Sequence, residues 1–226
     1  FWNSRNARRK QSGTLIWWFK EFLDEVGHDK ATLLMHTDAR DPHGQDLPHI
    51  INRLDLNDGQ VLLSTEKVGP ADLAVMYQAA DFTIGISDAE GFGLSTLESL
   101  STGTPIIVNM TGGLQDQVTD GEQWFGVGIE PASKCIIGSQ DIPYIYEDRL
   151  NKDDFINALT KIYKMSKEER QEMGAKGKEY VDKNFNFEKY FRVPMSKYQY
   201  DYYSFLVENQ SLEGCCYLLL VVPLKS

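Results

Sequence analysis

Short apolar runs alternate with amphipathic stretches along the first half of the chain. Each apolar run is bounded by turn-forming or polar residues and is too short for a buried helix, so each predicts a strand. The predicted strands are an opening one that enters a loop near Ser4, then 32–36, 61–65, 82–87 and 105–109. Apolar residues three and four positions apart predict helices between them, at 14–26, 47–54, 70–80 and 92–101.

This alternation predicts an α/β fold, with a Rossmann-like parallel sheet and helices on both of its faces. The strands are apolar throughout, as expected of strands that are buried on both sides. Ligands of such sheets bind outside the carboxyl ends of the strands. The candidate ligand-binding loops are therefore 4–12, 37–46, 65–69, 87–93 and 110–113.

The pattern changes after Pro131. Residues 132–149 show no clear period and predict an inserted loop with a candidate strand at 144–146. Its aromatic and acidic residues suit either a surface that contacts an acceptor or a second lobe, or a packed loop, and we favour the packed loop. Beyond the insertion the periodicity predicts C-terminal helices at 151–165, 166–183 and 187–208. Ser166 followed by Glu169 is the signature of a capping box at the second of them.

Composition narrows the function classes. The chain has 226 residues and a formal net charge of -10, which disfavours nucleic acid as the main partner. Its three cysteines show no ligand or disulfide spacing, which favours a reducing compartment over a disulfide framework or a zinc site. We expect a cytoplasmic setting from these features.

The most informative stretch is Asp88-Ala-Glu-Gly-Phe-Gly-Leu-Ser-Thr-Leu-Glu98. Its Gly-Phe-Gly falls between a predicted strand and a predicted helix, where free N–H groups and the helix dipole favour an anion. Glu90 stands at the strand tip, and Glu98 lies further along, among apolar helix residues. A buried carboxylate without a partner is costly, so we expect Glu98 to have a functional partner such as a pair of ribose hydroxyls.

A basic run, Arg5-Asn-Ala-Arg-Arg-Lys10, follows the first predicted strand. Arginine offers a two-pronged donor and lysine a point charge, so the run suits a diphosphate. The alternative is a solvated basic turn. The strongly acidic balance of the chain favours the diphosphate interpretation.

The series Glu90-Gly-Phe-Gly-Leu94 to Glu98, then Gly103-Thr-Pro-Ile-Ile107 and Thr111-Gly-Gly113, resembles a known signature. It is similar to the EGFG-x-x-x-x-E, G-x-P-V-I and G-G motifs of retaining nucleotide-sugar glycosyltransferases with the GT-B fold, in particular those of group 1, or family four. Arg5 and Lys10 resemble the basic pair of that family's donor-binding lobe, and Phe185-Asn-Phe187 resembles its terminal segment.

The resemblance implies a role for each matching residue. Arg5 and Lys10 would hold the donor diphosphate and Glu90 would contact the transferred sugar, which together form the implied catalytic group. The implied substrate-binding positions are Gly91, Phe92, Gly93, Leu94, Glu98 and Val68: backbone N–H groups of the glycine loop for the distal phosphate or the sugar, Glu98 for the ribose, and the Val68 backbone for the base. The resemblance implies no metal or other cofactor, because cations and a helix dipole stabilise the leaving diphosphate.

The resemblance covers about residues 1–192, which we interpret as the C-terminal, donor-binding lobe of a GT-B enzyme. Residues 193–226 would form a C-terminal helix and an apolar tail. We expect the chain to be a fragment that lacks the N-terminal acceptor lobe and is inactive alone. The implied partners are a nucleoside-diphosphate sugar, the missing lobe, and an acceptor that is a sugar, lipid or protein, with no nucleic acid. Family members also work at the cytoplasmic membrane face, although no basic amphipathic helix supports peripheral attachment here.

Three alternatives stay open at this point. The chain could be a non-catalytic lobe that binds a nucleotide sugar or another protein. It could belong to a GT-B nucleotide-sugar 2-epimerase, but the additional acid and base residues of that group are not visible. The third alternative is a metal site, built from a dense set of metal-capable residues: His36, Asp38, Asp41, His43 and Asp46. It is the weakest of the three, because the spacing of these residues matches no zinc pattern.

Overall fold

The computed structural model describes residues 1–185 of the chain. The strands are β1 (Trp2–Asn3), β2 (Leu33–His36), β3 (Val61–Ser64), β4 (Thr83–Gly85), β5 (Ile106–Asn109), β6 (Gly126–Ile129), β7 (Ser133–Ile136) and β8 (Tyr146–Arg149). The α-helices are α1 (Ser12–Val26), α2 (Leu47–Arg53), α3 (Pro70–Ala79), α4 (Leu94–Ser101), α5 (Gln115–Val118), α6 (Lys152–Lys164) and α7 (Lys167–Asn184). Two 3-10 turns, η1 (Arg8–Lys10) and η2 (Gly112–Leu114), complete the described elements.

The parallel strands fall into two groups that adjoin in the middle. One group has the order β1-β2-β3 and the other β4-β5-β6, with all neighbours parallel. Ile84 of β4 donates a backbone hydrogen bond to the carbonyl of Phe1, 2.9 Å away, which joins β4 to the β1 side. The strand order across both groups is therefore 3-2-1-4-5-6. Successive strands are added towards one edge of the sheet from β1 to β3 and towards the other edge from β4 to β6. The position between β1 and β4 is therefore the topological switch point, where ligands of this fold bind.

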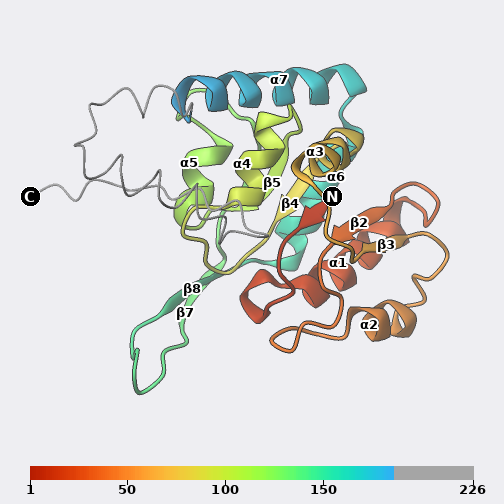
Figure 1. Ribbon diagram of the computed structural model, residues 1–226, viewed down its shortest axis with the longest axis vertical. Helices are drawn as coiled ribbons and strands as arrows, with labels where there is room; N and C mark the ends of the chain where they lie inside the picture. Colours follow the sequence, from red (N-terminus) through yellow and green to blue (C-terminus); the bar gives the residue numbers. More distant parts are fainter. Residues whose placement is uncertain (186–226) are drawn as a thin grey trace, which may run out of the picture. The chain divides into compact units, whose positions relative to one another are not determined.

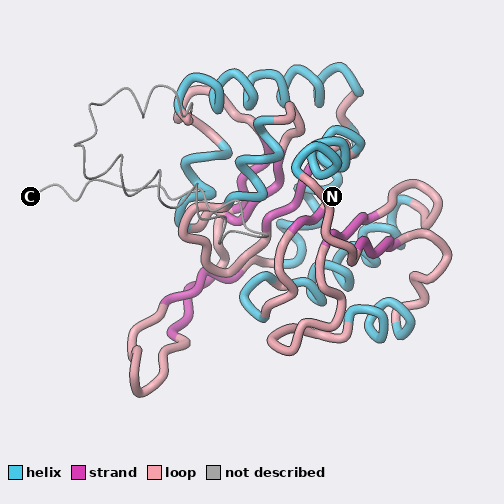
Figure 2. The backbone as a smooth tube through the Cα atoms, in the orientation of Figure 1, coloured by secondary structure: helices cyan, strands magenta, loops and turns pink. Residues whose placement is uncertain are grey.

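Helices cover both faces of these strands (Figure 1, Figure 2). Strand β5 shows how the two faces are divided. Ile107 belongs to a core cluster that contains side chains of α1, α2 and α6. Its neighbours Ile106 and Val108 belong to a second cluster, with side chains of α4, α5 and α7. Adjacent residues of a strand point to opposite faces, so the continuous apolar run was correctly interpreted as a strand buried on both sides, and the α/β fold class is confirmed.

Most predicted elements are present within a few residues of their expected bounds, and the capping box is confirmed. Ser166 Oγ accepts a hydrogen bond from Glu169 N at 3.1 Å, and the Glu169 carboxylate accepts one from Ser166 N at 2.6 Å. The sequence pattern did not reveal β6 or α5, which are only four residues each. The helix expected at 187–208 and the domain boundary expected at 192 lie outside the described residues.

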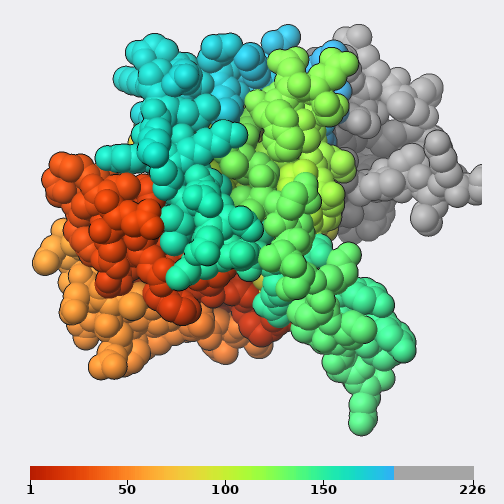
Figure 3. Space-filling view, turned by 180° about the vertical axis from the view of Figure 1, so that it is seen from behind, coloured from red at the N-terminus to blue at the C-terminus, as the bar shows by residue number. Residues whose placement is uncertain are grey.

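The insertion is not a packed loop, and that prediction was wrong. Strands β7 and β8 form an antiparallel hairpin that extends away from the parallel strands (Figure 1, Figure 3). Its apolar side chains lie largely in solvent, with 72% of Tyr144 and 60% of Ile142 exposed. A hairpin satisfies its backbone hydrogen bonds between its own two strands, so this segment keeps a regular structure without burying its side chains.

Candidate active site

The candidate site lies at the switch point, where the loops that follow β1 and β4 meet. Asp88 N, after β4, donates to the carbonyl of Arg9, after β1, at 2.8 Å. The loop after β5 joins them, because Gly113 N donates to the carbonyl of Glu90 at 3.2 Å. Three loops that are distant in sequence therefore meet at the carboxyl edge of the sheet.

Helix α4 begins directly after the glycine loop. Gly93 precedes it with φ 88°, and a Cβ at this position would lie 2.4 Å from a Leu114 side-chain carbon. Glycine is the residue that accepts this backbone conformation and this close contact. No side chain caps the first turn of α4, so its N–H groups are available to an anion. Gln117 supports the loop from behind, with Nε2 donating to the carbonyl of Phe92 at 2.6 Å.

Lys10 and Glu90 form an ion pair at the front of this loop. Each of the two side chains is 14% exposed. Arg9 joins them, with one guanidinium nitrogen 3.2 Å from Glu90 Oε2 and 2.7 Å from the carbonyl of Ala89. Burial lowers the pKa of Lys10, while Glu90 opposes that shift. Burial acts to raise the pKa of Glu90, but the charges of Lys10 and Arg9 outweigh it and leave that pKa below its usual value.

Glu98 has a partner from within the protein, which the sequence did not indicate. The hydroxyl of Tyr77, on α3, donates to Glu98 Oε2 at 2.8 Å and accepts a hydrogen bond from Asn3 Nδ2 at 2.8 Å. Burial raises the pKa of Glu98, and the Tyr77 hydrogen bond acts against that rise. Within residues 1–185, Glu98 Oε1 has no hydrogen-bond partner. One carboxylate oxygen is thus fixed by the protein and the other is available to a ligand.

Two other expected site residues lie apart from this group. Arg5 pairs with Asp41 in the loop after β2, with Nε 2.6 Å from Oδ2, and its side chain is 61% exposed. Val68 is half-buried in the loop that precedes α3. Among the described residues, neither makes a hydrogen bond or ion pair with Lys10, Glu90 or Glu98. The structure therefore brings together Lys10, Glu90 and the glycine loop, and their roles in donor binding stay predictions.

Sequence reasoning did not single out several residues of the site. Arg9 belongs to the basic run, but nothing in the sequence distinguished it from the other basic residues of that run. Glu147 and Arg149, at the base of the hairpin, and Asn3 with Tyr77 gave no sequence signal, because only folding brings them to this edge.

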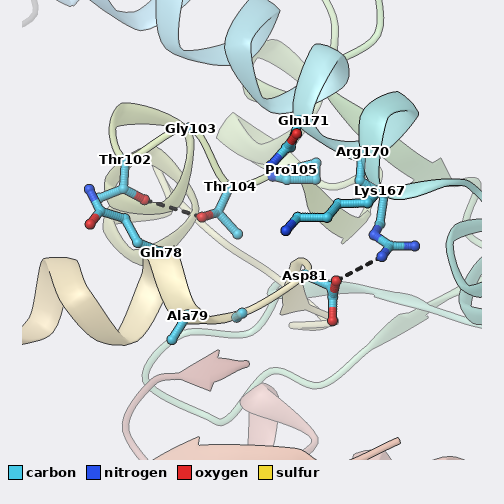
Figure 4. A pocket seen from close by; sticks show the side chains of 11 residues that line it. Gln78, Ala79, Asp81, Thr102, Gly103, Thr104, Pro105, Lys167, Arg170 and Gln171 are labelled. Carbon is cyan, nitrogen blue, oxygen red and sulfur yellow. Dashed lines mark hydrogen bonds and ion pairs between the residues drawn. The ribbon is translucent and has the colours of Figure 1, made fainter. Parts of the chain in front are cut away.

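The crevice beside Lys10, Glu90 and Gly93 is narrow, with a volume of about 10 Å³, and larger cavities lie elsewhere. One of about 480 Å³ lies at the opposite edge, beside the amino ends of β4 and β5 (Figure 4). It contains two cations, but Arg170 is paired with Asp81 at 3.0 Å and donates to the carbonyl of Met165. At the start of α7, beside this cavity, the Ser166 capping box already provides hydrogen-bond partners for the backbone N–H groups of Ser166 and Glu169. The uncapped start of α4 is therefore the better anion site, although the space there is smaller.

Three of the metal-capable residues noted in the sequence have structural partners. A ring nitrogen of His36 lies 2.9 Å from Ser64 Oγ, Asp41 pairs with Arg5, and Asp46 caps α2 through the N–H of His49. In the part of the chain that the structure describes, no three or more His, Cys, Asp or Glu side chains are placed together so that they could hold a metal ion. Among the same residues, no helix has both the length and the apolar character needed to cross a membrane.

Comparison with known proteins gives a consistent family assignment. The family model described as "Glycosyl transferases group 1" matches residues 45–180. An alpha-monoglucosyldiacylglycerol synthase of Streptococcus pneumoniae is 32% identical over 117 residues, which are 52% of this chain and 25% of that protein. A trehalose synthase of Pyrococcus horikoshii is 31% identical over 57% of this chain and 25% of its own length. The chain thus spans about a quarter of these relatives.

Solved structures support the same fold. A sucrose-phosphate synthase from Thermosynechococcus elongatus aligns with a TM-score of 0.65 and 23% identity, over 92% of this chain and 45% of that one. The C-terminal domain of a glycosyl transferase group 1 family protein from Francisella tularensis aligns with a TM-score of 0.58 and 17% identity, over 82% and 85%. These likenesses show the fold of a GT-B glycosyltransferase lobe. Because the family model covers more than half of the residues, the chain belongs to the glycosyl transferases group 1 family.

Proposed function

We propose that the chain supplies the donor-binding half of a retaining glycosyltransferase that moves a sugar from a nucleoside-diphosphate sugar to an acceptor. The observation that carries the proposal is the Lys10–Glu90 pair beside the uncapped start of α4. Backbone N–H groups, a helix dipole and cations then face one position at the switch point. A diphosphate is the ligand that uses all three.

The chemistry of the donor fits this arrangement. When the bond between the sugar carbon and the diphosphate oxygen breaks, negative charge accumulates on the leaving phosphate. Lys10, Arg9 and the N–H groups at the start of α4 would stabilise that charge in place. Glu90 would accept hydrogen bonds from the sugar, and the available oxygen of Glu98 would accept from the ribose. A polar, fixed surrounding lowers the barrier because it needs little reorganisation during the reaction.

Calorimetric titration of the 226-residue chain with UDP, GDP and ADP tests donor binding. We expect one of them to bind and Glu98→Ala to weaken that binding. Glu25→Ala is the matched control, because Glu25 is an exposed residue of α1. If none of the three nucleotides binds at millimolar concentration, or if one binds and Glu98→Ala does not weaken it, the donor site is wrongly assigned.

Sugar transfer and its stereochemistry are tested on a protein that carries both lobes, because the chain spans about a quarter of the length of its relatives. We expect that protein to transfer sugar from one nucleoside-diphosphate sugar, and we expect the chain alone to transfer none. NMR of the first product formed would show the same anomeric configuration as the donor. An inverted product would refute retention, and a longer protein that binds donor but transfers nothing would favour the non-catalytic alternative.

A further inference from the structure

The base of the β7–β8 hairpin is built into the candidate site, although its tip projects away from it. Asp148 N donates to the carbonyl of Asp88 at 2.7 Å. Asn109 Nδ2 donates to the carbonyls of Ser87, at 2.9 Å, and Asp148, at 3.0 Å. The hydroxyl of Thr111 donates to Asp148 Oδ2 at 2.7 Å. Strand β8 is therefore fastened to the loops after β4 and β5, which form two sides of the site.

A chain of ion pairs links the same hairpin base to the basic turn. Arg8 binds Glu147 with two nitrogens, at 2.6 and 3.0 Å. Arg149 donates to Glu147 Oε2 at 2.7 Å and also to Asp88 Oδ2. Glu147 is 2% exposed and Asp88 is 3% exposed. Carboxylates with so little access to water need these cations, because a buried charge without a partner is costly.

These ion pairs continue through Asp88 to the two residues that flank Lys10. Gln11 Nε2 donates to Asp88 Oδ2, and Asp88 N donates to the carbonyl of Arg9 at 2.8 Å. Gln11 itself has φ 58°, in the left-handed region, which ends the turn η1 before α1 begins. The contacts of Asp88 therefore fix the backbone on either side of Lys10, and the contacts of Arg149 fix Asp88.

This network divides the three consecutive basic residues of η1. Glu147 holds the Arg8 side chain at the hairpin base, while Arg9 and Lys10 turn to Glu90. Without Glu147, the remaining carboxylate that attracts Arg8 is Asp88, whose own contacts fix the backbone on either side of Lys10. The separation leaves Arg9 and Lys10 at the mouth of the site, next to the start of α4.

We propose that Glu147 and Arg149 are positioning residues of the donor site, which hold Arg9 and Lys10 in the arrangement that receives the diphosphate. The inference rests on the proposed function, because it assumes that the diphosphate binds beside Lys10. Neither residue needs to touch the donor. The parallel strands and both core clusters are formed without side chains of the hairpin, so the buried network at its base serves the site rather than the core.

The test compares nucleoside diphosphates with nucleosides on the 226-residue chain. The variant is Glu147→Gln, and the control is Tyr144→Ala, which changes the exposed part of the same hairpin. Calorimetry measures binding of UDP, GDP and ADP and of uridine, guanosine and adenosine. We expect Glu147→Gln to weaken diphosphate binding about tenfold, as for loss of one charge-assisted contact. We expect nucleoside binding to stay within about twofold, and Tyr144→Ala to change neither.

A double variant adds a readout that general damage to the fold would not give. If Glu147 acts through the basic turn, Glu147→Gln should cost little further affinity in a chain that already carries Lys10→Ala. Equal loss of nucleoside and diphosphate binding would show a merely structural role and overturn the inference. Unchanged diphosphate binding would also overturn it, while leaving the donor site intact.

Two further results are decisive. If the unaltered chain binds no nucleotide, the proposed function and this inference both fail. If Glu147→Gln does not fold by circular dichroism, Arg149→Lys replaces it, since lysine keeps the charge but cannot bridge Asp88 and Glu147 with a planar fork. The same split between diphosphate and nucleoside is expected, and equal loss of both again refutes positioning.

Discussion

Replacement of Lys10 by alanine separates the diphosphate from the rest of the donor. An ammonium group has three N–H donors, and Lys10 uses one of them for Glu90 Oε2 in the described part of the chain. The remaining donors can bind a phosphate oxygen without breaking the ion pair. Lys10→Ala removes those donors but leaves Glu98 and Tyr77 unchanged, so the ribose contact should persist.

The size of the expected loss of affinity follows from the kind of contact that Lys10→Ala removes. A hydrogen bond to a charged group contributes about 1.5–3 kcal/mol, so the dissociation constant of a nucleoside diphosphate should rise roughly 10- to 150-fold. Stability should fall as well, by roughly 1–3 kcal/mol, because Glu90 keeps only Arg9 as a cation and partly buried charges need partners.

The pH dependence of stability gives an independent check on whether the Lys10–Glu90 pair stabilises the fold. The pKa of Glu90 is held below its usual value because Lys10 and Arg9 outweigh the effect of burial. The stabilising contribution of this pair is therefore present above the unfolded-state pKa and is lost as pH falls through the folded-state pKa. The stability difference between the unaltered chain and Lys10→Ala should accordingly be largest at neutral pH and shrink in acid.

Calorimetry with one nucleoside diphosphate and its nucleoside measures the affinity, and thermal unfolding between pH 3 and 7 measures the stability. Lys20→Ala is the control, because Lys20 is paired with Asp24 on the exposed side of α1. An equal loss of affinity for nucleoside and diphosphate would show that Lys10 is not the diphosphate ligand. A stability difference that grows in acid would refute the role assigned to the ion pair.

Three further predictions concern Glu98 and the glycine loops. Because burial raises the pKa of Glu98, nucleoside binding should weaken as pH falls through that raised value; Glu98→Gln should remove this dependence in pH-resolved calorimetry. Tyr77→Phe should cost about 1.5–3 kcal/mol in thermal unfolding and shift the loss of binding to higher pH, since the hydrogen bond lowers the Glu98 pKa. Gly112→Ala should destabilise the chain by at least about 1–2 kcal/mol, because Gly112 has φ 49° and its Cβ would lie 1.8 Å from the carbonyl oxygen of Glu90. Gly91→Ala is the control for Gly112→Ala: a Cβ at Gly91 has no atom within 4 Å, so the free energy of unfolding from chemical denaturation should not change.

Local periodicity was enough to predict the class of fold and most of its elements. Buried parallel strands and amphipathic helices differ in the spacing of their apolar residues, and that spacing survives without any tertiary information. The meeting of the basic run with Glu90 was also predictable, because both follow strands whose carboxyl ends share one edge. The short elements β6 and α5 were not predictable. Two of the four residues of β6 are glycines, so it lacks a continuous apolar run, and α5 is a single turn with one apolar residue.

The sequence did not predict which side chains pair with one another. Arg5 and Lys10 were expected to act as a pair, yet the structure holds Arg5 at Asp41 and Lys10 at Glu90. The partner of Glu98 comes from another helix, and nothing in the spacing of the two residues indicates that the Tyr77 hydroxyl points at it. The hairpin was misjudged for a related reason, because its strands pair with each other and leave their apolar side chains outside any core.

A structure of the chain with the best-binding nucleoside diphosphate is the most direct test of the donor site. We predict the diphosphate at the start of α4, within hydrogen-bond distance of Lys10, and the ribose at the available oxygen of Glu98. A nucleotide bound instead in the cavity at the opposite edge, beside Asp81 and Arg170, would contradict this prediction.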